Sequence, residues 1–391
     1  MLIKKIELFE VVLPRRRPHK WATLITPIGQ GYVIVRITTD DGYAGYGEAT
    51  VLPEWGGDYG RYYGESAGTV ISVISNQLFP ALKDKSPLAI EPLVQQMNKV
   101  LKGHWYAKSA IEMALLDING KFLRQPVYNL LGGKVRDRAA LAHSLGLMDI
   151  KPALEEAERA VSEGIHTIKV KGGLEPARDI ELIQKLDAQY QGRVDFVLDG
   201  NQSYRSVAEA VKVIKKIEDC NMQYVEQPVP GIQNLARIRS QVTVPIMADE
   251  SIWSHFDVLD LIRAEAVDYV SIYIGKAGAL TGGRKVATVA EAGGLLCNVN
   301  GSAEFGVGNA ANLHLIACCP AISLPGVIPV TTIKGKEQTE VAGRFYQDDI
   351  VVEPFKYEDG CLIIPDKPGL GVEVDEDKLK HYSVREPLVL Q

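Results

Sequence analysis

Short apolar segments recur through the middle of the chain, and this recurrence constrains the fold more than any other feature of the sequence. Eight segments rich in Val, Ile and Leu follow one another from about residue 140, and most begin about 25–30 residues after the previous one, the length of a strand–helix unit. The predicted strands are 140–145, 166–171, 194–199, 223–226, 245–249, 268–274, 295–300 and 321–324. Strands that alternate with helices form a parallel sheet, and eight such units favour an α/β protein with a (β/α)8-type barrel over an open sheet.

The regions on either side of the predicted barrel have a different pattern. Residues 31–38 are rich in β-branched residues and predict a strand. Apolar residues recur at helical intervals over 107–124, and Pro126 ends the predicted helix. The end of the sequence is again strand-like, with Pro and Gly turns, so the two flanking regions are expected to pair as one second domain. The predicted segments are an N-terminal capping domain over 1–130, the barrel over 131–345, and a C-terminal segment over 346–391 that completes the cap.

Charge and composition limit the class of protein. The chain of 391 residues has a formal net charge of −6, whereas proteins that bind nucleic acid or an anionic membrane present a basic face. No apolar run reaches the ~20 residues that span a bilayer. The five cysteines include no CxxC pair, so a structural zinc site is not expected. The first three residues are followed at once by Lys4, Lys5 and a strand-like pattern, so no signal peptide is expected. We therefore expect a cytoplasmic protein with a small-molecule partner, and neither a nucleic-acid nor a membrane partner.

Three successive predicted strands each end in a carboxylate. Asp199, Glu226 and Asp249 close the third, fourth and fifth strands, and the active site of such a barrel lies at the carboxyl ends of its strands. Carboxylates that converge repel one another unless a cation lies between them. Oxygen ligands alone favour a hard ion, Mg²⁺ before Ca²⁺ or Mn²⁺, so one Mg²⁺ is the predicted cofactor. The alternative is that each acid caps the helix after its strand.

Two lysines lie two positions apart on the second predicted strand. Lys169 and Lys171 therefore point to the same side, which is the barrel interior. Free lysine has a pKa of about 10.4, and a neighbouring ammonium and a divalent cation would lower this pKa. Such an amine beside a metal fits removal of a proton from the carbon alpha to a carboxylate. The alternative is an ion-pair network in which the lysines neutralise the acids.

These residues resemble those of the enolase superfamily, and within it the muconate-lactonizing (cycloisomerase) subgroup. The similarity covers nearly the whole chain and includes IEMALLDINGK at 111–121, PVYNLLGG at 126–133, the two lysines, the three acids and PDKPGLGVEVDEDKL at 365–379. The resemblance implies the barrel, an α+β cap completed by the C-terminal segment, one Mg²⁺, and a homo-oligomer. It also implies Lys171 as the acid/base, Lys169 as its assistant, and two cap loops, near 14–30 and 47–60, that close over the substrate.

One position departs from the pattern of that subgroup. The subgroup usually carries a second catalytic lysine on the sixth strand, where this chain has Tyr273, and Lys276 follows one turn later. The seventh strand has no histidine of the mandelate racemase kind. Only one face of the substrate then has a strong base, and Tyr273 is a candidate weak acid on the opposite face.

A single lysine can take the alpha proton and then protonate a hydroxyl that leaves from the same face. We therefore expect a lyase, a dehydratase of a small hydroxy- or imino-acid such as cis-3-hydroxy-L-proline. A racemase, epimerase or cycloisomerase of a carboxylate that uses Lys171 is the alternative, and a non-catalytic binding descendant of the fold is a second one. Candidate substrate-binding residues are Asn201, Glu250, Lys276, Glu304, Lys20, Trp21 and Trp55. The basic run of Arg15, Arg16 and Arg17 with His19 and Lys20 either binds an anionic substrate group or lies in solvent.

Overall fold

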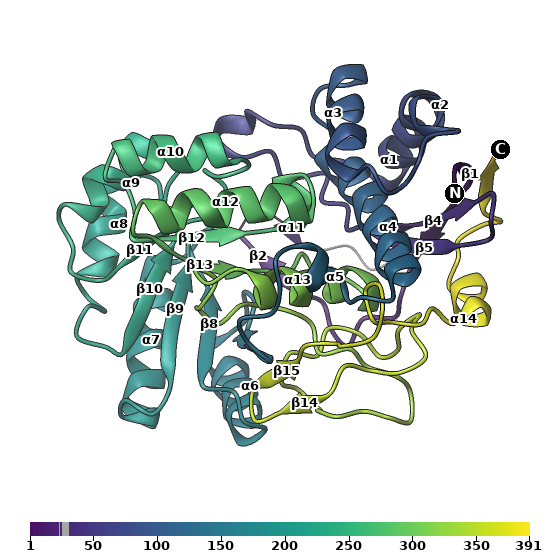
Figure 1. Cartoon of the computed structure of the whole chain (residues 1–391). Coiled ribbons are helices and arrows are strands. Elements are labelled where there is room, and N and C mark those ends of the chain that lie inside the picture. Colours follow the sequence, from purple (N-terminus) through teal and green to yellow (C-terminus); the bar gives the residue numbers. More distant parts are fainter. Residues whose placement is uncertain (23, 26–30) are drawn as a thin grey trace.

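A parallel sheet lies in the left half of the view in Figure 1. The computed structural model describes residues 1–22, 24–25 and 31–391. Seven strands lie in the order β13-β12-β11-β10-β9-β8-β7, so strands that follow one another in sequence are neighbours in space. The strands are β7 (Ala142–Ser144), β8 (Thr167–Lys171), β9 (Asp195–Asp199), β10 (Met222–Glu226), β11 (Ile246–Ala248), β12 (Tyr269–Ile272) and β13 (Leu296–Val299). These are the first seven predicted strands; six are shorter than predicted by a residue or more, and β10 begins one residue earlier than predicted.

The segment after β13 closes this sheet into a barrel without forming a strand. Ile322 makes a parallel bridge to β13, and Gly326 makes one to the residue that precedes β7. The prediction of an eighth strand over 321–324 is wrong, since the described chain has only these isolated bridges there. Pro320 and Pro325 flank the segment, and because a proline has no N–H to donate, the hydrogen-bond ladder cannot extend. The barrel fold itself is confirmed.

Helices follow the strands and cover the outside of the barrel. In the helix after β7, Ala153, Ala157 and Ala160 are buried, at the spacing of one apolar helix face, so this face packs inward. The helices are α6 (Ile150–Ser162), α7 (Pro176–Tyr190), α8 (Val207–Ile214), α9 (Ile232–Arg239), α10 (His255–Arg263), α11 (Ile274–Ala277), α12 (Leu280–Ala292) and α13 (Gly306–Cys318).

A second, antiparallel sheet belongs to the cap. Its order is β16-β1-β4-β5, with β1 (Ile3–Val11), β4 (Tyr32–Thr39), β5 (Ala44–Ala49) and β16 (Leu388–Leu390). Because β16 pairs with β1, the C-terminal segment joins the N-terminal cap, as predicted. The exact residue boundaries of the three predicted segments stay a prediction.

The remaining elements of the cap surround this sheet and its connections to the barrel. They are β2 (Lys20–Trp21), β3 (Leu24–Ile25), α1 (Ala67–Val73), α2 (Phe79–Leu82), α3 (Ile90–Val100), α4 (Trp105–Leu123), α5 (Val127–Leu130) and α14 (Glu376–His381). A small antiparallel sheet, β14 (Tyr357–Glu358), β15 (Cys361–Ile363) and β6 (Arg138–Ala140), joins the C-terminal segment to the chain just before the barrel.

Strand β5 lies directly against α4, the helix predicted over 107–124. A Cβ atom on Gly47 would come within 1.8 Å of the carbonyl oxygen of Ala110, and one on Gly45 within 2.2 Å of that of Ala114. Only glycine permits so close an approach of strand and helix backbones. Residues 106–120 of α4 are buried, so this helix is the centre of the cap.

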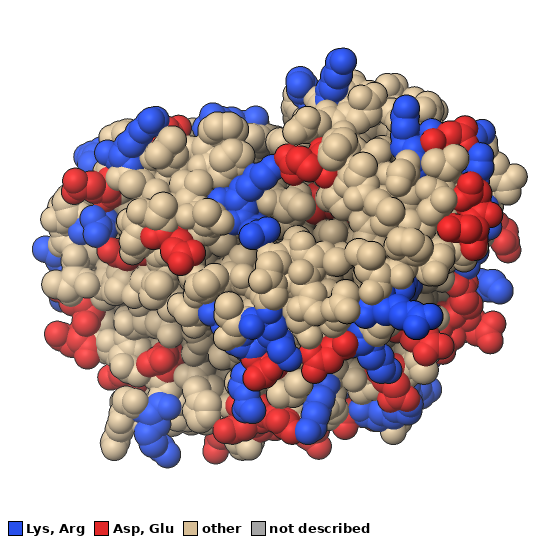
Figure 2. Space-filling view, viewed as in Figure 1, with Lys and Arg blue, Asp and Glu red and all other residues tan. Residues whose placement is uncertain are grey.

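The surface carries charges of both signs. On the face in Figure 2, Lys and Arg side chains lie among Asp and Glu side chains. In the described parts of the chain, no helix combines the length and the apolar character that crossing a membrane requires. The expected partners, a small-molecule carboxylate and further copies of the chain, stay predictions.

Candidate active site

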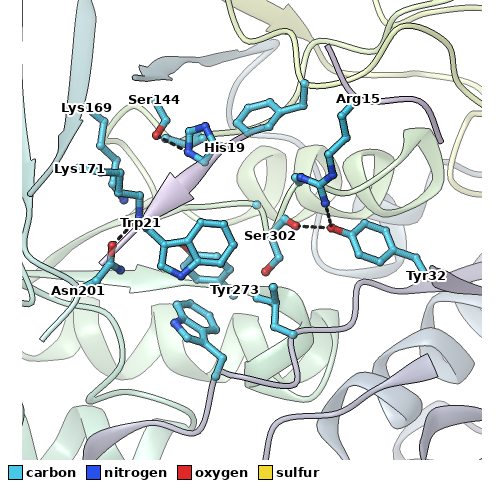
Figure 3. A pocket seen from close by; sticks show the side chains of 16 residues that line it. Arg15, His19, Trp21, Tyr32, Ser144, Lys169, Lys171, Asn201, Tyr273 and Ser302 are labelled. Carbon is cyan, nitrogen blue, oxygen red and sulfur yellow. Dashed lines mark hydrogen bonds between the residues drawn. The ribbon is translucent and has the colours of Figure 1, made fainter. Parts of the chain in front are cut away.

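A pocket lies where the cap covers the carboxyl ends of the barrel strands (Figure 3). The barrel contributes Ser144, Lys171, Asn201 and Tyr273, each at or just beyond the end of its strand, and Lys169, two residues before the end of β8. The cap contributes Arg15, His19, Trp21, Tyr32, Leu52 and Trp55. The pocket is therefore built by both domains, and its floor is the edge at which the predicted catalytic residues lie.

The cap loop near 47–60 is tied to the barrel at this edge. The Asp58 carboxylate accepts hydrogen bonds from the backbone N–H of Gly231 at 2.9 Å, from the Ser251 hydroxyl at 3.0 Å and from the Gln202 amide at 2.7 Å. The other expected lid, near 14–30, lies outside the described residues at 23 and 26–30. The loop near 47–60 is thus fixed over the pocket, and Trp55 on this loop lines the pocket.

Three neighbouring strands bring the three predicted carboxylates to one edge. Asp199 and Glu226 are register partners at the ends of β9 and β10, and Asp249 directly follows β11. All three side chains are fully buried. Charges in such a place need partners of opposite sign, because water does not solvate them.

Lysine ammonium groups supply that opposite charge. Lys169 Nζ lies 2.8 Å from both carboxylate oxygens of Glu226 and 3.0 Å from Asp199 Oδ2. Lys171 Nζ donates to Asp199 Oδ2 at 2.6 Å and to Asn201 Oδ1 at 3.0 Å. The ion-pair network that was the alternative reading of the lysines is therefore present.

These contacts shift the pKa values of the paired groups. Burial alone would lower the pKa of Lys169, but the charges of Asp199 and Glu226 outweigh it and raise that pKa well above its usual value. Burial acts to raise the pKa of Asp199, but Lys169 and Lys171 outweigh it and hold that pKa at about 2. The two carboxylates thus outweigh burial at Lys169 when no divalent cation lies between them, and the lowering expected beside such a cation stays a prediction.

Lys276 pairs with the third carboxylate. Its ammonium donates to Asp249 Oδ1 and, at 2.6 Å, to the Asp249 backbone oxygen. The ammonium also lies 5.2 Å from the ring centre of Trp55 and 4.8 Å from that of Tyr273. Lys276 is fully buried, so it lies behind the pocket wall, and its predicted contact with substrate stays untested.

The donor set can be compared with the needs of a divalent cation. Among the described residues, no group of three or more His, Cys, Asp or Glu side chains already has the arrangement of a metal site. The carboxylates of Asp199, Glu226 and Asp249 nevertheless offer only oxygen, which suits a hard ion. In addition, Asp249 Oδ2 is buried without a hydrogen-bond partner in the described structure. These residues fit Mg²⁺ in donor type and burial, and they are the ones that would hold it.

Tyr273 follows β12 and lines the pocket. Its ring meets that of Trp55 edge-on, with 4.7 Å between the ring centres. Burial, and then the charges of Asp249 and Glu226, raise the pKa of Tyr273 well above its usual value. The phenol therefore keeps its proton at neutral pH and can donate a hydrogen bond.

The remaining predicted residues lie at different depths. Trp21 and Trp55 line the pocket, whereas Lys20 is exposed and lines an outer groove. Glu250 is buried and accepts a hydrogen bond from Asn201 Nδ2 at 3.0 Å. Glu304 is buried behind the residues that line the pocket, and burial raises its pKa to about 7.

The structure adds pocket residues to which sequence reasoning gave no specific role. Ser144 ends β7, and its hydroxyl lies 3.2 Å from His19 Nε2. Burial, and then the charges of Arg17 and Lys171, lower the pKa of His19 well below its usual value, so this ring is neutral. The alternation of side chains along β7 is the signal that places Ser144 inward, but no sequence signal places the cap residue beside it.

The chain belongs to the mandelate racemase/muconate lactonizing enzyme family of the enolase superfamily. Residues 4–132 match the mandelate racemase/muconate lactonizing enzyme N-terminal domain, and residues 153–378 match the enolase C-terminal domain-like family.

Relatives along the full length define the class more closely. The chain is 30% identical to muconate cycloisomerase 1 of Rhodococcus opacus over 97% of this chain and 98% of that one. It is also 30% identical to the N-succinyl-L-Arg/Lys racemase of Bacillus cereus, over 100% of both chains, and the crystal structure of that racemase superposes with a TM-score of 0.90. The L-Ala-D/L-Glu epimerase of Bacillus subtilis is 31% identical over 95% of this chain and 97% of that one.

These relatives overturn the expectation of a lyase. They are cycloisomerases, racemases and epimerases, which are isomerases. The expectation rested on one strong base and a missing second lysine, but one lysine that exchanges a proton at an alpha carbon serves isomerisation as well as elimination. The reading as a dehydratase was therefore wrong, and the isomerase alternative agrees with the relatives.

Proposed function

We propose that this protein is a cycloisomerase of an unsaturated carboxylate, with Lys171 as the group that exchanges a proton with the carbon alpha to that carboxylate. The observation that carries the proposal is the setting of Lys171. Its Nζ lies in the pocket between two acceptors, Asp199 Oδ2 at 2.6 Å and Asn201 Oδ1 at 3.0 Å. These two acceptors fix the position of Lys171 Nζ, from which a proton can pass to a substrate bound in the pocket.

Ring closure needs only one proton transfer to carbon. As a nucleophilic oxygen of the substrate forms a bond to the β carbon, the electron pair of the double bond moves to the alpha carbon and its carboxylate. Lys171 then gives a proton to the alpha carbon, becomes a neutral amine, and regains a proton from solvent. A divalent cation such as Mg²⁺, held by Asp199, Glu226 and Asp249, would stabilise the negative charge that develops on the substrate carboxylate.

Two neighbours support this role of Lys171. Asn201 holds the lysine through its amide oxygen and is itself held through its amide nitrogen by Glu250. Lys169 remains paired with Glu226 and Asp199, so its charge compensates the carboxylates at the floor of the pocket. Lys171 is then the one of the two lysines free to turn its proton toward the substrate, with 9% of the residue exposed against 1% for Lys169.

Epimerisation is a second candidate, and the position of Tyr273 favours it. Exchange of configuration at an alpha carbon needs one group on each face, and Tyr273 lines the pocket with its phenol protonated. Lys171 would take the proton from one face and Tyr273 would give one to the other. Giving this proton leaves Tyr273 ionised, and the reverse direction needs the same ionised form as a base. The raised pKa disfavours that form in both directions, so we place ring closure first.

Deuterium incorporation separates the two reactions. Muconate, 2-chloromuconate, the N-succinyl derivatives of L-Arg and L-Lys, and L-Ala-L-Glu are incubated in D2O with Mg²⁺, and the products are analysed by NMR. A cycloisomerase gives a cyclic product with one deuterium on one face of the alpha carbon. An epimerase gives deuterium in the inverted epimer.

The matched variants test Lys171 directly. Lys171→Ala is expected to abolish incorporation, whereas Lys185→Ala, which removes an exposed lysine on α7, leaves it unchanged. Tyr273→Phe distinguishes the candidates, because it leaves ring closure intact and stops inversion. A Lys171→Ala protein with full incorporation would show that another group moves the proton.

A further inference from the structure

One charged side chain of the pocket lies far from the carboxylates and lysines. Figure 3 shows Lys171 and Asn201 on one side of the pocket and Arg15 with Tyr32 on the other, with Trp21, Tyr273 and Ser302 between them. Arg15 comes from the cap, from the basic run that the sequence left open as an anion site or a solvated loop.

Arg15 differs from the other two arginines of that run in having no carboxylate partner. Arg16 and Arg17 each lie 2.7 Å from Glu156. In the described part of the chain no carboxylate lies within 4.0 Å of the Arg15 guanidinium, and the residues outside it, 23 and 26–30, include no Asp or Glu. Glu54 acts on Arg15 only through its charge from a greater distance.

Arg15 is nevertheless fixed in place. Its backbone makes an antiparallel bridge with Tyr346, and its guanidinium carbon lies 5.6 Å from the centre of that ring. Arg15 Nη2 donates to the Tyr32 hydroxyl at 3.4 Å, and that hydroxyl donates to the Ser302 backbone oxygen at 3.0 Å. A guanidinium has five N–H donors, so the contacts that the structure describes leave most of them for a ligand.

The pocket between the two charged ends is lined mostly by apolar side chains. Leu52, Trp55, Val327 and Phe345 line the pocket along with Trp21. Arg15 is partly buried in this wall, so its guanidinium loses part of its hydration, and an anion on a ligand would compensate for that loss. Arg recognises carboxylates and similar groups through two parallel N–H donors.

We propose that Arg15 binds a second anionic group of the substrate, so that the substrate is a carboxylate whose apolar chain carries another anion at its far end. The reacting carboxylate lies beside Lys171, and in this respect the inference rests on the proposed function. Arg15 then selects among carboxylates by requiring negative charge at the end remote from the reaction.

Binding of unreactive ligands tests this inference without turnover. Adipate, hexanoate and ε-aminocaproate have the same chain length and differ only in the group at the far end, which is anionic, apolar and cationic. Isothermal titration calorimetry with Mg²⁺ present gives their dissociation constants. Adipate is expected to bind the wild-type protein roughly tenfold to a hundredfold more tightly than hexanoate, as a charge-assisted contact implies, and ε-aminocaproate more weakly than hexanoate.

A variant of Arg15 is compared with a variant of its neighbour. Arg15→Gln is expected to weaken adipate by a similar factor and to leave the affinity for hexanoate unchanged. Arg16→Gln, which removes an arginine paired with Glu156, is expected to keep the preference for adipate. The unchanged affinity for hexanoate also shows that the Arg15→Gln pocket is folded.

The outcomes separate this inference from the proposed reaction. A wild-type protein that binds adipate and hexanoate equally, or ε-aminocaproate as well as adipate, overturns the role of Arg15 even if the variant fails to fold. Retained preference in Arg15→Gln overturns it as well. If the preference exists and depends on Arg15 while Lys171 moves no proton, the anion site stands and the proposed cycloisomerase is wrong.

Discussion

Replacement of Lys276 by Met tests how the floor of the pocket is held together. The lysine is fully buried, its ammonium donates to the Asp249 carboxylate and backbone oxygen, and Met has a straight apolar side chain of similar length. Removing one partner of a buried ion pair costs about 3–5 kcal/mol, because the other charge stays buried without compensation. Loss of the cation–π contacts with Trp55 and Tyr273 adds about 1 kcal/mol. We therefore expect Lys276→Met to lower the free energy of unfolding by roughly 4–6 kcal/mol.

Thermal unfolding followed by circular dichroism, with EDTA present, measures this effect. A loss of that size lowers the Tm by roughly 5–7 °C in a chain of this length. The double variant Lys276→Met with Asp249→Asn removes the stranded charge and is expected to regain part of the loss. Lys285→Met is the matched control, because that lysine makes a half-exposed pair with Glu91 at 2.8 Å, which is worth at most about 1 kcal/mol.

Two results would refute the reasoning. One is a Tm of Lys276→Met no lower than that of Lys285→Met, which would mean that Asp249 tolerates burial without its ammonium. The other is a double variant less stable than Lys276→Met, which would mean that the lost stability came from packing and not from the unpaired charge.

Three further outcomes are expected. Mg²⁺ at about a hundred times its Kd should stabilise the folded protein by about 2.7 kcal/mol and so raise its Tm. Asp199→Asn should remove this rise in Tm, and an equal rise in the variant would show that the ion binds elsewhere. Burial, and then the charge of Glu304, raise the pKa of Glu48 to about 8 from 4.5, so its contribution to stability is present below pH 4.5 and is lost as the pH rises through 8. Over that range the Tm of Glu48→Gln should fall less than that of the wild type, and parallel curves would contradict the raised pKa. Gly47→Ala should lower the free energy of unfolding by roughly 3 kcal/mol or more. The control is Gly192→Ala, which should cost only about 1–2 kcal/mol, because Gly192 has a positive φ of 79° but nothing within 4 Å of the added Cβ. Similar Tm values for the two variants would contradict the close approach of β5 to α4.

The periodic parts of the fold were accessible from sequence, since each buried parallel strand is a short apolar run bounded by turns. The eighth strand was not, because 321–324 has the composition of a strand while the prolines on either side prevent a ladder. A closing segment held by single bridges has no periodic signature of its own.

The strand ends also predicted which acids and lysines meet at the floor of the pocket. They did not predict which acid pairs with which lysine. Lys276 was expected near the substrate, yet its long flexible side chain reaches back to Asp249. The run of Arg15, Arg16 and Arg17 shows the same limit. Identical residues in a row carry no signal for which one enters the pocket, and here the bridge between Arg15 and Tyr346, far along the chain, decides it.

The pairing of β1 with β16 has a consequence for biosynthesis. On the ribosome β1 emerges early, but the strand at its edge consists of Leu388–Leu390. The nascent polypeptide must therefore keep one side of β1 without its native neighbour while the whole barrel is translated, and an unpaired strand edge is prone to aggregation. Chaperone demand during synthesis, and sensitivity of expression to fusions placed near residue 390, are expected to follow from this single strand pair.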